Sequence, residues 1–93
     1  MARKNYSYEL WAIGYTEDEG ITDYDELVAE FPHTETGKME GLQKLRTIQP
    51  ADLGKLPDDV KLVHFALEEV ADFSKTERSA VDIVGERWVR KSL

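Results

Sequence analysis

Hydrophobic and polar residues alternate along residues 6 to 15, a segment rich in aromatic and branched side chains. Successive side chains of a β-strand point to opposite faces of its sheet. One face would carry Tyr6, Tyr8, Leu10 and Ala12, and the other Trp11, Ile13 and Tyr15. Because both faces are partly apolar, the pattern predicts a strand in the interior of a sheet.

Residues 24 to 31 alternate in the same way, with Leu27, Ala29 and Phe31 on one face and Glu26, Val28 and Glu30 on the other. The polar residues 16 to 20 separate this segment from the first, and we expect Gly20 to close the turn with a positive φ. The two segments would then form a hairpin.

A helix is the alternative for this second segment. Apolar residues lie at helical spacing behind a possible N-cap at Thr22 or Asp23,. They are Tyr24, Leu27, Val28 and Phe31. The strand interpretation is favoured by the clean alternation, and Pro32 would end either element.

A single amphipathic helix is predicted over residues 36 to 49. Its apolar residues recur every three positions, at Met39, Leu42, Leu45 and Ile48, and Lys44 and Arg46 suit a helix C-terminus,. Gly41 costs about 1 kcal/mol relative to alanine, so tertiary packing must stabilise this helix. Leu53 and Leu56 lie in the Pro- and Gly-containing connector that follows, and could pack under the sheet,.

Residues 60 to 71 and 80 to 90 are predicted to form a second hairpin, joined by the polar residues 74 to 79. The first of these segments also fits a helix beginning behind Pro57, with a stripe of Leu62, Phe65, Ala66, Val70 and Phe73,. Strand is favoured because its expected partner is β-branched and interrupted by Gly85, as in a strand with a bulge,.

These elements predict one α+β domain over residues 1 to 93, in the order strand, strand, helix, strand, strand,. The sheet would be four-stranded and mainly antiparallel, with the helix on one face. Its other face would carry some of Trp11, Ile13, Tyr15 and Trp88, an apolar area typical of a homodimer or partner contact.

Composition restricts the chemistry. The chain has no cysteine, which excludes disulfides, thiolate metal sites and a cysteine nucleophile,. No apolar run has the ~18 residues that a membrane span needs, and the first residues lack a signal-type apolar stretch, so we expect a cytoplasmic protein that does not bind membranes. The net charge of −7 disfavours direct contact with nucleic acid,.

The negative charge is concentrated in residues 6 to 35, which contain no lysine or arginine. Nine of the chain's 19 acidic residues lie there, and the remaining ten are set against 12 basic residues. The densest part is Glu17, Asp18, Glu19, Asp23, Asp25 and Glu26. Such a cluster suits either a solubilising loop or contact with a basic partner.

Several catalytic and metal-binding patterns fail on spacing. An EF-hand register on Gly20 would place Tyr15 where the first carboxylate belongs,. His33 is expected to be an exposed loop residue and His64 a side chain on one face of its element, with no carboxylate at ligand spacing. Glu68 and Glu69 would point to opposite faces of a strand and could not act together. No cofactor is expected.

We therefore expect a non-enzymatic interaction or regulatory module whose partner is a protein, basic if it meets the acidic turn, or a second copy. The candidate interaction residues are Glu17, Asp18, Glu19, Asp23, Asp25, Glu26, Trp11 and Tyr15. One alternative is an acidic mimic of nucleic acid that inhibits a DNA- or RNA-binding protein. Another is a small enzyme of unknown class.

Overall fold

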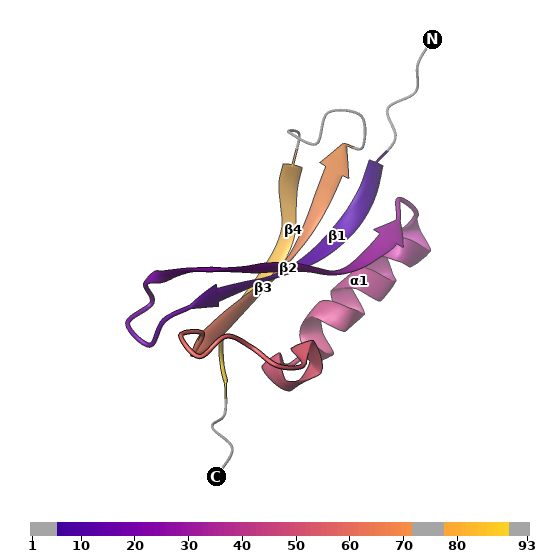
Figure 1. Cartoon of the computed structure of the whole chain (residues 1–93). Helices are drawn as coiled ribbons and strands as arrows, with labels where there is room; N and C mark the ends of the chain where they lie inside the picture. The colour runs from indigo at the N-terminus through magenta and orange to yellow at the C-terminus, as the bar shows by residue number, and fades with distance from the viewer. Residues whose placement is uncertain (1–5, 72–77, 90–93) are drawn as a thin grey trace.

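The computed structural model describes residues 6–71 and 78–89, which form a four-stranded antiparallel sheet with one α-helix on one face (Figure 1). The strands are β1 (Tyr6–Tyr15), β2 (Ile21–Pro32), β3 (Leu62–Ala71) and β4 (Arg78–Trp88). The helix α1 (Glu35–Thr47) is followed by a short 3₁₀-helix, η1 (Pro50–Leu53). The strand order in the sheet is β2-β1-β3-β4. The predicted α+β class and the order of elements are confirmed.

β1 and β3 are the two interior strands, as the two-sided apolar pattern of residues 6 to 15 predicted for β1. In β3, Phe65 and Leu67 face the helix while Leu62 and Val70 face the other way, and all four are buried. A strand that is buried on both sides has nearly continuous apolar sequence, which explains why residues 60 to 71 also fitted a helix. Of the predicted loop at 74 to 79, residues 74 to 77 lie outside the described residues, and the last two belong to β4.

A β-bulge in β2 overturns the predicted faces of that strand. Leu10 pairs with Ala29, but the next residue of β1, Trp11, pairs with Leu27, so Val28 is an extra residue. Val28 packs against the core, whereas Leu27 lies beside Trp11 on the opposite face and is 37% exposed. The expectation that Leu27 shares the core face of Ala29 is therefore wrong, because a bulge reverses the alternation beyond it.

The hydrophobic core lies between the sheet and α1. Its buried side chains come from β1, β3, the C-terminal end of α1 and the connector before β3. They are Tyr8, Leu10, Ala12, Leu45, Ile48, Val60, Val63, Phe65 and Leu67. Leu53 and Leu56 from the connector pack partly against it, as expected. Met39 does not, because it is 69% exposed on the surface of α1, and its predicted place in the apolar stripe is wrong.

Glycine allows α1 to approach the sheet closely. A Cβ on Gly41 would lie 2.9 Å from Cδ1 of Leu67 and 3.3 Å from the ring of Phe31. The low helix propensity of Gly41 is thus offset by packing that a larger residue would prevent. Thr34 caps the helix N-terminus, where its Oγ1 accepts a hydrogen bond of 2.9 Å from the backbone N–H of Gly37,.

Arg87 of β4 binds the other end of α1. Its guanidinium donates hydrogen bonds to the backbone carbonyls of Leu45, Arg46 and Ile48, at 3.0 Å for the first two. The same group lies 5.6 Å from the ring centre of Phe65. A cation therefore satisfies helix carbonyls that have no partner within the helix and joins the helix to the sheet.

None of the helices in the described part of the chain is long and apolar enough to cross a membrane.

Candidate interaction surface

Cross-strand rows of residues make up the sheet face opposite α1, which we call the open face. The row Pro32, Ser7, Val70, Arg78 lies at one end, and four further rows follow it. Read from β2 to β4, they begin with the row Glu30, Glu9, Glu68, Ala80 and continue with the row Leu27, Trp11, Ala66, Ile83. The third row is Asp25, Ile13, His64, and the fourth is Ile21, Tyr15, Leu62, Trp88. Apolar and aromatic side chains thus dominate the second and the fourth of these rows, and Ile13 lies between them.

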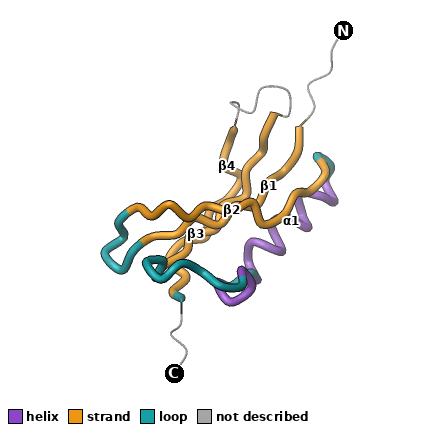
Figure 2. Tube along the Cα trace, viewed as in Figure 1, coloured by secondary structure: helices purple, strands orange, loops and turns teal. Residues whose placement is uncertain are grey.

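The apolar side chains that the outer strands and β1 place on the open face are accessible, whereas Leu62 and Ala66 of β3 are buried. Ile83 is 57% and Trp88 52% exposed, while Trp11, Ile13 and Tyr15 are half-buried. The helical elements lie on the other side of the sheet (Figure 2). Among residues 6–71 and 78–89, no element covers the open face. Trp11 and Tyr15, predicted as interaction residues, do share this face, and Ile83 joins them through the strand order.

His64 packs within the open face. Its ring centre lies 4.6 Å from that of Tyr15, and a Cβ on Gly85 would be 3.1 Å from the imidazole. The predicted bulge at Gly85 is confirmed by a register shift in the β3–β4 pairing. His64 is thus a side chain on one face of its strand, as expected, and the glycine makes room for it.

Glutamates stand next to one another in the first row, because Glu9 pairs with both Glu30 and Glu68. Like charges directly opposite each other destabilise a sheet. Arg78 compensates by bridging Glu9 at 3.0 Å and Glu68 at 3.1 Å. Burial lowers the pKa of Arg78, but its hydrogen bonds and charge interactions with these glutamates outweigh this and raise the pKa overall,.

Trp11 connects this charged row to the apolar rows. Its Nε1–H donates a 2.9 Å hydrogen bond to Glu9, and the guanidinium of Arg78 lies 5.6 Å from the centre of its ring. The indole is therefore held in one orientation by a polar contact and a cation. Glu30, by contrast, has no ion pair within the described residues.

The acidic turn lies at the far end of the β1–β2 hairpin (Figure 1), and Glu17, Asp18 and Glu19 are all exposed. The backbone N–H of Thr16 donates to the carbonyl of Gly20 at 2.8 Å, which closes the turn. Glu19 has the positive φ, 65°, so the expectation that Gly20 supplies it is wrong. Gly20 instead donates its N–H to Oγ1 of Thr16 at 2.9 Å, and a Cβ there would also lie 2.9 Å from that oxygen.

The six predicted acidic residues do not form one cluster. Asp25 lies on the open face, whereas Glu26 lies on the helix side and accepts a 2.5 Å hydrogen bond from the hydroxyl of Tyr24. Burial and this contact raise the pKa of Tyr24 well above its usual range. Within the described residues, no three His, Asp or Glu side chains gather as metal ligands.

His33 is an exposed loop residue, as the sequence predicted, but it contacts a carboxylate that the sequence did not indicate. Its Nε2 lies 2.7 Å from Oε2 of Glu69, and its ring stacks on Tyr8 with centres 4.9 Å apart. Glu68 and Glu69 do point to opposite faces, towards Arg78 and His33 respectively. Spacing could not reveal the histidine contact, because 36 residues separate the pair.

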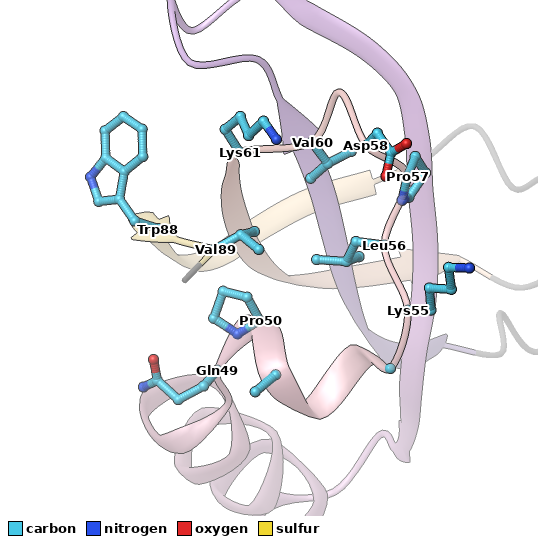
Figure 3. A pocket seen from close by; sticks show the side chains of 12 residues that line it. Gln49, Pro50, Lys55, Leu56, Pro57, Asp58, Val60, Lys61, Trp88 and Val89 are labelled. Carbon is cyan, nitrogen blue, oxygen red and sulfur yellow. The ribbon is translucent and has the colours of Figure 1, made fainter. Parts of the chain in front are cut away.

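A shallow groove of about 720 Å³ lies where the connector after η1 meets the end of β4. Leu56 and Val89 point towards each other across it (Figure 3). Its polar side chains, including Gln49, Lys55 and Asp58, stand at separate places on the rim. The groove therefore lacks the convergent polar groups that fix a small ligand.

Reversing the charge of the turn is expected to leave the fold intact. A Glu17→Lys, Asp18→Lys, Glu19→Lys variant should melt at the same or a slightly higher temperature at low salt, because it relieves repulsion along residues 16 to 26. The gain should shrink in high salt, where the charges are screened. Thermal unfolding at two salt concentrations measures both effects. A lower melting temperature at low salt would show that the carboxylates stabilise the turn.

Comparison with protein-family models, curated proteins and solved structures finds no significant match. The geometry alone defines the class, a small α+β domain whose sheet is covered by a helix on one face and open on the other.

Proposed function

We propose that this protein is a non-enzymatic interaction module that binds another protein through the open face. The observation that supports this function is the gathering of seven exposed or half-buried large apolar side chains on a face that no described element covers. They are Trp11, Ile13, Tyr15, Ile21, Leu27, Ile83 and Trp88.

An antiparallel sheet can expose one face to water, but that face then normally carries polar residues. Here the central rows carry indole, phenol and aliphatic groups instead. Tryptophan and tyrosine are enriched in the buried centres of protein interfaces, where their rings supply large contact areas. An exposed group of apolar side chains of this kind is typical of a contact site.

The distribution of the acidic residues favours this function over mimicry of nucleic acid. A mimic needs carboxylates spread over one surface in place of a strand's phosphates. In this protein the predicted acids occupy the turn and both sides of β2. The aromatic residues, unlike the acidic ones, therefore lie together on one face of the sheet.

The test uses two matched substitutions of exposed apolar residues. Ile83→Asp places a charge on the open face, and Met39→Asp places the same charge on α1, on the opposite side of the molecule. Affinity capture from the native lysate with wild-type protein should isolate a partner. Ile83→Asp should capture at least about tenfold less of that partner, whereas Met39→Asp should capture as much as wild type. Equal retention by both variants would contradict the use of the open face.

Salt separates the proposed function from mimicry in the same experiment. A partner held by apolar contacts should stay bound as the salt concentration rises, whereas a mimic's partner should be released steeply. Release of the captured protein from wild type at moderate salt, together with equal capture by Ile83→Asp and wild type at low salt, would favour the mimic.

A further inference from the structure

The chemistry of the open face specifies what it can bind, given the function proposed above. Its carboxylates include Glu9, Asp25, Glu30 and Glu68, and its only guanidinium among the described residues is Arg78. Arg78 is already bonded to Glu9 and Glu68. Asp25 and Glu30 have no ion pair within the described residues, and both lie on β2, at one side of the apolar rows.

This charge distribution argues against a second copy as the occupant. Face-to-face packing of two copies would bring together at least eight carboxylates and, from the described residues, two arginines, because each face contributes the same set. Burying unpaired carboxylates near one another is strongly unfavourable. A partner that brings positive charge to the side of β2 would instead neutralise Asp25 and Glu30.

The edges of the sheet do not favour an added strand. The pairing of β2 with β1 shifts register at two places, and so does that of β4 with β3. Bulges interrupt the regular row of backbone donors and acceptors that strand addition requires, and charged residues on an edge oppose it further. Binding across the face is therefore favoured over binding along an edge.

The dimensions of the open face match one helix. Four strands spaced about 4.8 Å apart give a face roughly 14 Å wide, and an α-helix with its side chains is about 10 to 12 Å in diameter. Along β1, Glu9 and Tyr15 are six residues apart, which is roughly 20 Å of strand. A helix needs about 13 residues to span that length.

We propose that the open face binds a basic amphipathic α-helix of a partner protein. Its apolar side chains contact Trp11, Ile83 and Trp88, and lysine or arginine side chains along one flank pair with Asp25 and Glu30. On the opposite side of the sheet, α1 packs against all four strands, so one helix already lies across the sheet there.

The test uses designed peptides of about 18 residues, each long enough to cross the face. One has leucines on one helical side and lysines on the other, a second replaces the lysines by glutamates, and a third scrambles the leucine–lysine sequence so that no apolar side remains. Titration calorimetry against the full chain measures each dissociation constant. The leucine–lysine peptide should bind at least about tenfold more tightly than either control.

Matched charge variants locate the contact. Asp25→Lys with Glu30→Lys should weaken binding of the leucine–lysine peptide by about tenfold, because two attractions become repulsions. Glu17→Lys with Glu40→Lys changes the net charge equally but lies off the open face, and should weaken binding by no more than about twofold. Equal weakening by the two pairs would overturn the proposal, since only the net charge would then matter.

Other outcomes separate this inference from the function on which it rests. Tighter binding of the leucine–glutamate peptide than of the leucine–lysine peptide would overturn the basic partner. If Ile83→Asp then lost that binding and Met39→Asp kept it, the open face would remain the interaction surface. A wild-type dimer in sedimentation that Ile83→Asp dissociates would make a second copy the occupant and overturn the helix. Binding of no peptide by a monomeric wild type would also overturn it.

Discussion

Replacing Phe65 by alanine is expected to lower the free energy of unfolding by about 3 to 5 kcal/mol. Phe65 is fully buried in the interior strand β3, paired with Ala12 and Val84, and has the guanidinium of Arg87 over its ring. Truncation removes the ring from the core and leaves a cavity that strands on both sides prevent from closing. Denaturant unfolding of wild type and variant measures the difference.

Two leucines provide the comparison. Leu10→Ala should cost about 2 to 5 kcal/mol because Leu10 is fully buried, whereas Leu27→Ala should cost less than about 1 kcal/mol because its side chain is 37% exposed on the open face,. Without the bulge in β2, Leu27 would share the core face of Ala29, and truncating it would lower the free energy of unfolding as much as truncating Leu10. Equal costs for Leu10 and Leu27 would contradict the pairing of Leu27 with Trp11.

Replacing Arg87 by methionine is expected to lower the free energy of unfolding by about 2 to 4 kcal/mol. The substitution keeps the aliphatic part of the side chain but removes the donors that satisfy three carbonyls at the end of α1. Hydrogen bonds from a charged group are stronger than neutral ones, and the carbonyls would be left without these partners. Denaturant unfolding measures the loss, and amide hydrogen exchange should show faster opening of the last turn of α1.

Arg46→Met is the matched control. Arg46 carries the same charge in the last turn of α1, but its side chain is exposed, and its role in the contact with Arg87 is limited to its backbone carbonyl. Arg46→Met should lower the free energy of unfolding by no more than about 1 kcal/mol, because it removes only a positive charge that interacts with the helix dipole. If the two variants lost the same stability, the role of Arg87 would be that of a general positive charge.

Local patterns predicted the elements because most of the strands and the helix carry a clear period. Residues 6 to 15 alternate with both faces apolar, which identified an interior strand, and Gly85 marked the bulge in β4. The errors come from places where a contact between distant segments determines which side chains are buried. Val28 is an extra residue only in relation to β1, and Met39 is exposed because Gly41 lies over Leu67 in the helix–sheet interface.

The interaction surface was predictable only in part for the same reason. Trp11 and Tyr15 share a face by their spacing within one strand, but Ile83 joins them only through the strand order. The row of three glutamates spans three strands, so no stretch of sequence contains it. His33 with Glu69, and Arg87 with the end of α1, are likewise contacts between segments distant in the sequence.

The strand order also constrains how the chain can fold. Each outer pairing joins strands that are neighbours in the sequence, so β1 with β2 and β3 with β4 need only short loops to close. The central seam between β1 and β3 requires Tyr15 to meet Leu62, which closes a loop containing β2, α1 and η1. Closing a long loop costs chain entropy before the new contacts repay it, which makes non-local pairing slow. Substitutions of buried residues between β1 and β3 should thus change chiefly the folding rate, whereas substitutions in the outer strands β2 and β4 should change chiefly the unfolding rate.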